Sequence, residues 1–298
     1  MGPRRIPNAL DMKIGLIGSG RWAEILANAL PSKESLSCVL SSRANPKLGP
    51  FVNTKFTSCF REFIKNDYDR IIIANTASKH VETLIRIRDV HPYMKLLLEK
   101  PVCIDGKDYE ELKNFKSDMN ILVDHTLLFD DEFTKIHKDT QKGLLTAVKT
   151  IDGSDGPFRQ DCTSLWDYGP HSISLALHFG VQSSASLSVK YDNSYKLKSR
   201  RGELYILNFK INDSIECNFM IGSGMPMKNR RYSLIFTNKE VIIDITNPVK
   251  HTALKNMFNI FLDDSDLNDS RWGLDLSLQV TELLLELSNQ VKENPNPH

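Results

Sequence analysis

The 298-residue sequence has no excess of either charge and no long apolar run. Its 38 Lys and Arg residues balance 37 Asp and Glu residues, so the net charge is +1 and nothing favours general binding to nucleic acid or acidic membranes. The longest apolar runs, such as Ile71–Ala74, are strand-sized, whereas a helix across a bilayer needs about 20 apolar residues. We therefore expect neither a nucleic-acid partner nor a membrane span.

Cysteine is also scarce. The five cysteines are widely spaced and form no CxxC pair: Cys38, Cys59, Cys103, Cys162 and Cys217. This pattern excludes a disulfide framework and a zinc ribbon, and it favours a reducing compartment such as the cytoplasm. Residues 1–11 contain no apolar core of a secretory signal, and we interpret them as a disordered leader.

The apolar content of 41% is that of an ordinary globular protein, and the length predicts two domains. Residues 12–124 alternate short apolar runs with helical patterns; the runs are at 13–18, 36–40, 70–74, 94–98 and 120–123. Continuous apolar strands separated by helices are typical of a doubly wound parallel sheet. We therefore expect a Rossmann domain in residues 12–124.

Residues 125–298 have a different pattern, with longer alternating strands joined by polar turns such as Asn212-Asp213. Helices are predicted at 130–141, from Gly169-Pro170 onward, and at 274–291. Consecutive alternating strands indicate an α+β domain with a mostly antiparallel sheet open on one face. Such an open apolar face should be buried against another surface.

The first predicted strand ends in Gly18-Ser19-Gly20-Arg21-Trp22-Ala23, which fits G-x-G-x-x-A at the start of a helix. The first glycine permits a tight turn, and the second lets a pyrophosphate approach the backbone at the positive end of the helix. The stretch from Gly18 to Trp22 is therefore a candidate dinucleotide site. The alternative is an ordinary glycine turn.

The second strand is followed by Ser41-Ser42-Arg43, where NAD-binding domains usually place an acidic residue for the ribose 2′-hydroxyl. Two hydroxyls and a guanidinium suit a 2′-phosphate, which favours NADP over NAD. The alternative is a solvated arginine in a loop.

Two further segments follow buried strands, where ligands bind in open α/β sheets. One contains Asn75, Thr76 and His80, and the other contains Glu99 and Lys100. Lys100 precedes Pro101, which restricts its backbone, so its ammonium can be aimed into a site. The alternative is a surface lysine in a loop.

The segment Leu165–Ser174 places Asp167 four residues before His171. A carboxylate near an imidazole orients the ring and raises its basicity, which suits a proton shuttle. His178 is about 10 Å farther along the helix, so the two histidines cannot share a metal ion, and no metal site is predicted. Single histidines on helices are more often structural, which is the alternative.

Together, GLIGSGRWA, IIIANTASKH, LLLEKPV and LWDYGPHSIS resemble the glucose–fructose oxidoreductase / inositol dehydrogenase / MocA family, in the family's order and across the chain from residue 12. The resemblance implies that Lys100 contacts substrate and nicotinamide, that His171 is the acid/base, and that the turns after Ala74 and around Glu99 flank the nicotinamide. Many members carry an acid directly after this histidine or three residues beyond it. Here these positions are Ser172 and Ser174. Family members commonly form dimers and tetramers through the open sheet, so the resemblance also implies a homo-oligomer.

The resulting hypothesis is an NAD(P)-dependent oxidoreductase acting on a CH–OH group of a sugar or nucleotide sugar. One alternative is a reductase of an imine or another conjugated ligand. A second, supported by the two serines, is a weakly catalytic protein that binds the cofactor as a sensor or partner subunit. Arg230 and Arg231 are further candidates for contacting a phosphate or carboxylate.

Overall fold

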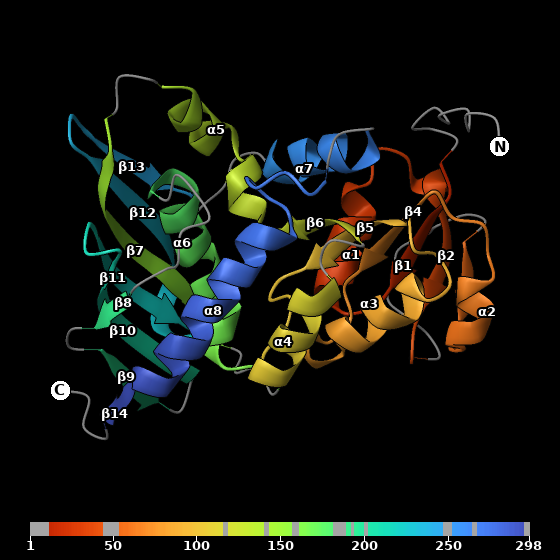
Figure 1. Ribbon diagram of the computed structural model, residues 1–298, viewed down its shortest axis with the longest axis horizontal. Coiled ribbons are helices and arrows are strands. Elements are labelled where there is room, and N and C mark those ends of the chain that lie inside the picture. The colour runs from red at the N-terminus through yellow and green to blue at the C-terminus, as the bar shows by residue number, and fades with distance from the viewer. Residues whose placement is uncertain are drawn as a thin grey trace.

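The computed structural model describes residues 12–43, 54–115, 119–139, 143–156, 161–180, 189–191, 194–199, 202–246, 252–263 and 267–294. The predicted leader, residues 1–11, lies outside this part of the chain. Two sheets lie side by side along the longest axis of the molecule, with helices between them (Figure 1).

The first sheet has six parallel strands in the order β3-β2-β1-β4-β5-β6. They are β1 (Ile14–Ile17), β2 (Leu36–Leu40), β3 (Lys55–Thr57), β4 (Arg70–Ile73), β5 (Lys95–Glu99) and β6 (Asn120–Asp124). Their central residues are buried because helices cover both faces. The predicted doubly wound parallel sheet is confirmed, although β3 was not predicted.

Helices of this region are α1 (Arg21–Ala29), α2 (Phe60–Ile64), α3 (His80–Arg88) and α4 (Gly106–Phe115), with short 3₁₀ turns η1 (Lys33–Ser35) and η2 (Ala77–Lys79). A helix from far along the chain, α7 (Thr252–Leu262), packs against α1 and β5. The buried guanidinium of Arg70 donates hydrogen bonds to the carbonyls of Phe261 and Asp263 at the end of α7. The last part of the chain therefore packs against the first sheet as well as against the second half of the molecule.

The second sheet has eight strands in the order β13-β12-β7-β11-β10-β9-β14, with β8 beside β10. They are β7 (Leu145–Asp155), β8 (Val189–Tyr191), β9 (Tyr195–Ser199), β10 (Gly202–Ile211), β11 (Ile215–Gly222), β12 (Gly224–Phe236), β13 (Glu240–Asp244) and β14 (Lys292–Asn294). Most pairs are antiparallel, and Asn212 and Asp213 turn the β10–β11 hairpin with φ of 52° and 53°. The open α+β sheet is confirmed; β7, β9 and β14 were not predicted.

One face of this sheet packs against α6 (Ser164–Gly180). Helix α8 (Leu274–Gln290) packs on α6 and also contacts α4 and β6, so the two helices lie between the sheets (Figure 1). The chain reaches the second sheet through η4 (Thr126–Phe129) and α5 (Asp131–Lys138). Gly169 permits close contact between α6 and α8, because a Cβ there would lie 2.8 Å from Leu284 Cδ2.

The predicted start of α6 was wrong. The helix begins at Ser164, and Pro170 lies inside it. Proline removes only one donor, to the carbonyl of Trp166, and the preceding Gly169 has no Cβ to crowd the proline ring. Burial of eleven residues of α6 outweighs that loss. Asp167 is therefore helical, one turn before His171.

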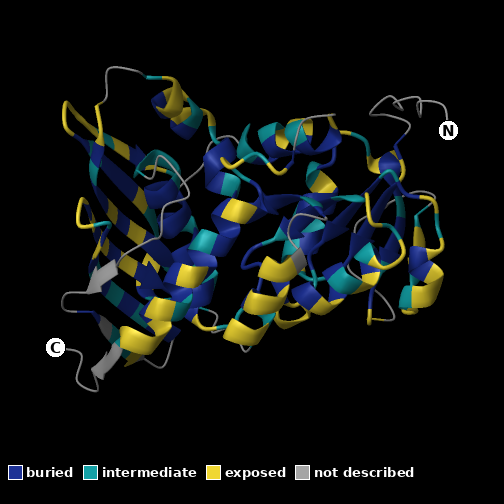
Figure 2. Ribbon diagram, viewed as in Figure 1, coloured by how far each residue is buried: buried dark blue, intermediate teal, exposed yellow. Residues whose placement is uncertain are grey.

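The outer face of the second sheet is exposed in Figure 2, and it carries the large apolar side chains Ile151, Met220 and Ile242. No helix in the described part of the chain is long and apolar enough to cross a membrane.

Candidate active site

A cleft of about 2060 Å³ opens at the carboxyl ends of β1, β4 and β5 and extends to α6 and β12 of the second sheet. The order of the first sheet reverses between β1 and β4, so the loops after these strands diverge and leave room for a ligand. The site therefore receives residues from both halves of the molecule.

The glycine turn forms one wall. Gly18 has a φ of +119°, and a Cβ there would lie 2.3 Å from the carbonyl oxygen of Ala74, so only glycine fits. Gly20 is the N-cap of α1 and has no side-chain cap; within the described structure, no atom lies within 4 Å of where its Cβ would be. With Ser19 and Arg21 it lines the cleft, leaving space and helix N-terminal amides for a pyrophosphate.

The residues after β2 lie beside this turn. Ser41 Oγ donates to Ser19 Oγ at 2.7 Å and accepts from the Arg43 amide, so this serine is buried and ties the two loops together. Ser42 and Arg43 are exposed and line the cleft. The Arg43 guanidinium donates to the Ser19 carbonyl at 3.4 Å, which keeps a positive charge at the glycine turn.

Asn75 and Thr76, after β4, also line the cleft. The described residues that line the cleft do not include His80. Its ring is fully buried, with Nδ1 2.9 Å from the Pro101 carbonyl and Nε2 3.2 Å from the Asn75 carbonyl. His80 therefore has a structural role in joining the loops after β4 and β5. The sequence predicts that it contacts the cofactor directly, and the structure does not place it there.

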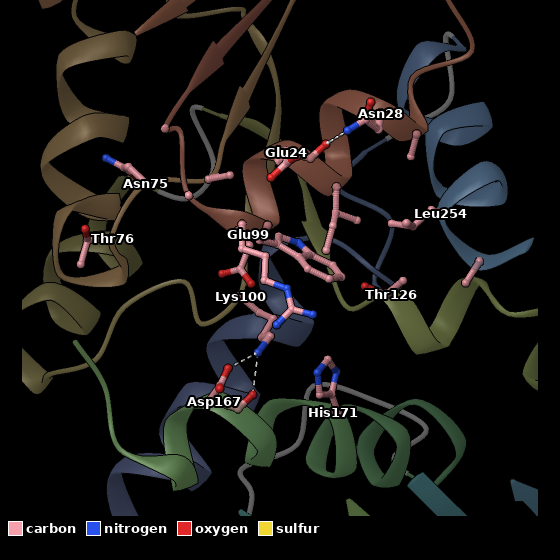
Figure 3. Close-up of a pocket in the computed structure, with 18 of the residues that line it drawn as sticks. Glu24, Asn28, Asn75, Thr76, Glu99, Lys100, Thr126, Asp167, His171 and Leu254 are labelled. Carbon is pink, nitrogen blue, oxygen red and sulfur yellow. Dashed lines mark hydrogen bonds and ion pairs between the residues drawn. The ribbon is translucent and has the colours of Figure 1, made fainter. Parts of the chain in front are cut away.

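Lys100 extends from the end of β5 toward α6 (Figure 3). Its Nζ donates hydrogen bonds to Asp167 Oδ1 at 2.9 Å and to the Asp167 carbonyl at 2.5 Å. The lysine is 7% exposed, so its charge lies in a region of low dielectric and is matched by the carboxylate. Glu99 and Lys100 both line the cleft. This contact joins the first sheet to the helix of the second half.

His171 lies one helical turn after Asp167 and also lines the cleft. Its Nδ1 is buried and has no hydrogen-bond partner in the described structure. The Asp167 carboxylate binds Lys100, and the expected pairing of this carboxylate with Nδ1 of His171 is not formed. Burial, together with the positive charges of Lys100 and Arg230, lowers the pKa of His171 well below its usual value. The imidazole is neutral at pH 7 and able to accept a proton.

Ser172 and Ser174 are fully buried, and the described lining of the cleft includes neither. Ser174 Oγ donates to the carbonyl of His171 within the helix. The side chains at both positions point into the packed interior. The absence of acids there thus removes no group from this cleft.

A buried polar group next to the cleft lining was not identified from the sequence. Asp152 on β7 is fully buried, accepts a hydrogen bond from the Tyr232 hydroxyl at 2.6 Å, and lies 3.4 Å from Arg230 Nε. Burial raises the pKa of Asp152, and the Arg230 charge opposes that rise. Tyr168 on α6 also lines the cleft, with its hydroxyl 2.8 Å from Ser154 Oγ. Only Arg230 carried a sequence signal, as part of a basic stretch.

His125, behind the site, gives a testable pH dependence. It is 1% exposed, and burial, with the charge of Lys100 adding, lowers its pKa to about 3. Below pH 6.5 the unfolded chain takes up a proton that the folded protein does not, so stability falls by about 1.4 kcal/mol per pH unit until about pH 3. The free energy of unfolding in urea can be measured for the wild type and for His125→Gln at pH 7 and pH 5. Between these two pH values, the difference in free energy of unfolding should shift by about 2 kcal/mol in favour of the variant. An unchanged difference would contradict the neutral buried state.

Among the described residues, no group of three His, Cys, Asp or Glu side chains could hold a metal ion. The donors that are present instead suit a dinucleotide: an open glycine turn, an uncapped helix N-terminus and an arginine beside them.

No protein-family model and no curated protein matches the chain in sequence. Solved structures do match in fold. A 3-ketoreductase from Actinomadura kijaniata, in complex with TDP-benzene and NADP, aligns with a TM-score of 0.77 at 13% identity, covering 96% of this chain and 99% of its own. UDP-N-acetylglucosamine 3-dehydrogenase from Acidithiobacillus ferrooxidans gives 0.76 at 12% identity, with 94% and 97% covered.

Scyllo-inositol dehydrogenase from Lactobacillus casei, with bound NAD(H) and scyllo-inositol, aligns with a TM-score of 0.74 at 15% identity, covering 94% of this chain and 96% of its own. Each alignment spans both sheets. The two-domain fold implied by the sequence resemblance is therefore confirmed: this chain has the fold of inositol and nucleotide-sugar oxidoreductases.

Proposed function

We propose that the protein belongs to the glucose–fructose oxidoreductase / inositol dehydrogenase / MocA family and is an NAD(P)-dependent oxidoreductase of a secondary alcohol or ketone carbon. The observation that carries this proposal is the contact between Lys100 and Asp167, with His171 one turn away, in a cleft that begins at an open glycine turn. A charged donor and a neutral base lie together beside the proposed dinucleotide site, an arrangement that suits hydride transfer at a CH–OH group.

A bound nicotinamide supplies the ring that takes or gives the hydride. The protein's own residues manage the proton. Lys100, held by Asp167, donates a hydrogen bond to the reacting oxygen and stabilises the negative charge that develops there. The neutral imidazole of His171 takes the hydroxyl proton in oxidation and, once protonated, returns it in reduction.

The proposed substrate class rests on the proteins that share this fold and on the size of the cleft. The structural neighbours include an inositol dehydrogenase, a UDP-N-acetylglucosamine 3-dehydrogenase and a 3-ketoreductase in complex with TDP-benzene. The cleft here extends well past the glycine turn, to α7 and β12, which gives room for a substrate larger than a monosaccharide. We propose a sugar or nucleotide sugar.

The test is a rate measurement with NAD⁺ and NADP⁺ against inositols and UDP- and TDP-linked sugars, followed by the absorbance of the reduced nicotinamide. Turnover with one member of the panel supports the proposal. Binding of the cofactor with no turnover of any polyol, keto-sugar or nucleotide sugar, in either direction, would overturn it.

Cofactor choice depends on Arg43, whose guanidinium lies at the glycine turn. We expect Arg43→Ala to weaken NADPH binding roughly 10- to 100-fold, the usual worth of a hydrogen bond to a charged group. NADH has no 2′-phosphate, so its affinity should change less than about threefold. Isothermal titration of both cofactors checks this result. Equal weakening of NADPH and NADH binding would mean that Arg43 contacts a part of the cofactor that both share.

We also propose that the outer face of the second sheet forms a homo-oligomer interface. Ile151, Met220 and Ile242 are exposed there and flank a groove of about 400 Å³. Burial of such side chains against a second copy would remove apolar surface from water.

A further inference from the structure

Trp22, which lines the cleft, makes a contact that the glycine motif does not explain. It is the second residue of α1, which follows β1, yet its indole Nε1 donates a 2.7 Å hydrogen bond to Asp124 Oδ2 at the end of β6. In the sheet, β4 and β5 lie between β1 and β6. The indole therefore lies across the carboxyl edge of the sheet, beside the strand end that carries Lys100.

Asp124 is built to hold that indole. Its carboxylate is 1% exposed, and its other oxygen, Oδ1, accepts from Thr126 Oγ1 at 2.5 Å. The residue pairs in register with Glu99, immediately before Lys100. Burial raises the pKa of Asp124, and the hydrogen bonds from Thr126 and Trp22, together with the charge of Lys100, oppose that rise. Burying a carboxylate is costly unless its oxygens are bonded, and here both are.

Trp22 itself is only half-buried and lines the cleft between the glycine turn and Lys100. Glu99, Lys100 and Thr126, which flank this part of the cleft, are labelled in Figure 3. A large flat side chain with its polar edge satisfied behind it presents only its aromatic surface to a ligand.

We propose that Trp22, anchored by Asp124, is a positioning residue that forms the wall against which the cofactor's nicotinamide ring rests. This inference depends on the proposed function, because it requires a nicotinamide cofactor. An aromatic wall adds dispersion with a planar ring, and an indole also attracts the cationic oxidised nicotinamide. The Asp124 hydrogen bond keeps the wall in place when the cleft is empty, which lowers the ordering cost of binding.

Fluorescence tests the contact without any substrate. Titration with NADPH and NADH should quench tryptophan emission and produce emission from the reduced nicotinamide when the indole is excited. Trp22→Phe should remove most of this transferred emission and weaken cofactor binding about 2- to 10-fold, the range of one aromatic contact. The matched control is Trp166→Phe, because Trp166 is buried in the core and lies outside the described cleft lining; it should retain the transferred emission.

The anchor is tested by two replacements of Asp124. Asp124→Asn keeps an acceptor oxygen for the indole, so energy transfer and affinity should stay within about twofold of the wild type. Asp124→Ala removes the acceptor, and it should reproduce the weaker affinity of Trp22→Phe together with reduced energy transfer. Thermal unfolding of each variant confirms that it is folded before titration.

The outcomes separate the two levels of the proposal. A wild type that binds both reduced cofactors while Trp22→Phe shows unchanged energy transfer and affinity overturns the role of Trp22 alone. Wild-type behaviour in Asp124→Ala overturns the anchor. A wild type that binds neither NADPH nor NADH, by fluorescence or by thermal shift, overturns the proposed function and this inference with it.

Discussion

Replacing Lys100 with methionine is expected to lower kcat/KM by about 10²- to 10³-fold, the usual effect of removing one preorganised donor from a developing oxyanion. Methionine has a similar length and no charge, so the loss reports the ammonium rather than the volume. Because the described bonds of the Lys100 ammonium go to Asp167 on α6 and not to the glycine turn, affinity for NAD(P)H should change much less than turnover. Steady-state rates combined with cofactor titration check this result.

The matched control is Lys79→Met. Lys79 also lines the cleft, but its side chain is 63% exposed and forms an ion pair with Glu82 at 3.1 Å. Exposed pairs of this kind contribute little, so this variant should keep activity within about twofold. If both lysine variants lose activity equally, the effect is one of general charge. If Lys100→Met remains active, the assignment of Lys100 fails.

The parallel sheet could be predicted because its strands are continuous apolar runs that end in turns, a pattern set by burial on both faces. An interior strand of the second sheet, β7, could not be predicted. Its sequence, LTAVKTIDGSD, mixes polar and apolar residues, and its place is fixed by pairing with β11 and β12 more than 60 residues later. Pairing across such separations leaves no local signal.

Helix α7 was also not predicted, but for a different reason. Leu254, Met257, Phe258 and Phe261 are buried and follow helical spacing, so the signal was present in the sequence. What the pattern does not reveal is the partner, because α7 lies after the strands of the second sheet and returns to pack on α1 and β5. Local periodicity predicts an element and its buried face, but not the surface that buries it.

The same distinction between local patterns and long-range contacts applies to the candidate site. Lys100 and His171 were identified from motifs, and the structure brings both into one cleft. The partner of Asp167 was predicted from its spacing of four residues to His171, yet the carboxylate binds Lys100, 67 residues earlier. A buried ammonium without a counter-charge is costly, and this tertiary requirement decides the pairing. The Trp22–Asp124 contact, across 102 residues, had no sequence signal for the same reason.

His171→Asn is expected to lower kcat by about 10²- to 10⁴-fold, the range for removal of a general acid–base, with little change in cofactor affinity. Asparagine keeps a polar side chain of smaller size but cannot take a proton at these pH values. The control is His178→Asn, two turns farther along α6, where Nδ1 of the histidine lies 3.2 Å from the Arg271 carbonyl and the described cleft lining does not include the residue. That variant should keep activity near the wild-type level.

The pH profile of oxidation distinguishes a proton acceptor from a structural histidine. Burial and the charge of Lys100 lower the pKa of His171 well below 6.5, so the base form persists as the pH falls, and the rate should stay level through pH 6.5 and decline only below it. Removing the Lys100 charge raises the pKa of His171, so the residual activity of Lys100→Met should decline at a higher pH than that of the wild type. A single profile shared by both enzymes would mean that the titrating group is not His171, because the charge of Lys100 acts on the pKa of that histidine.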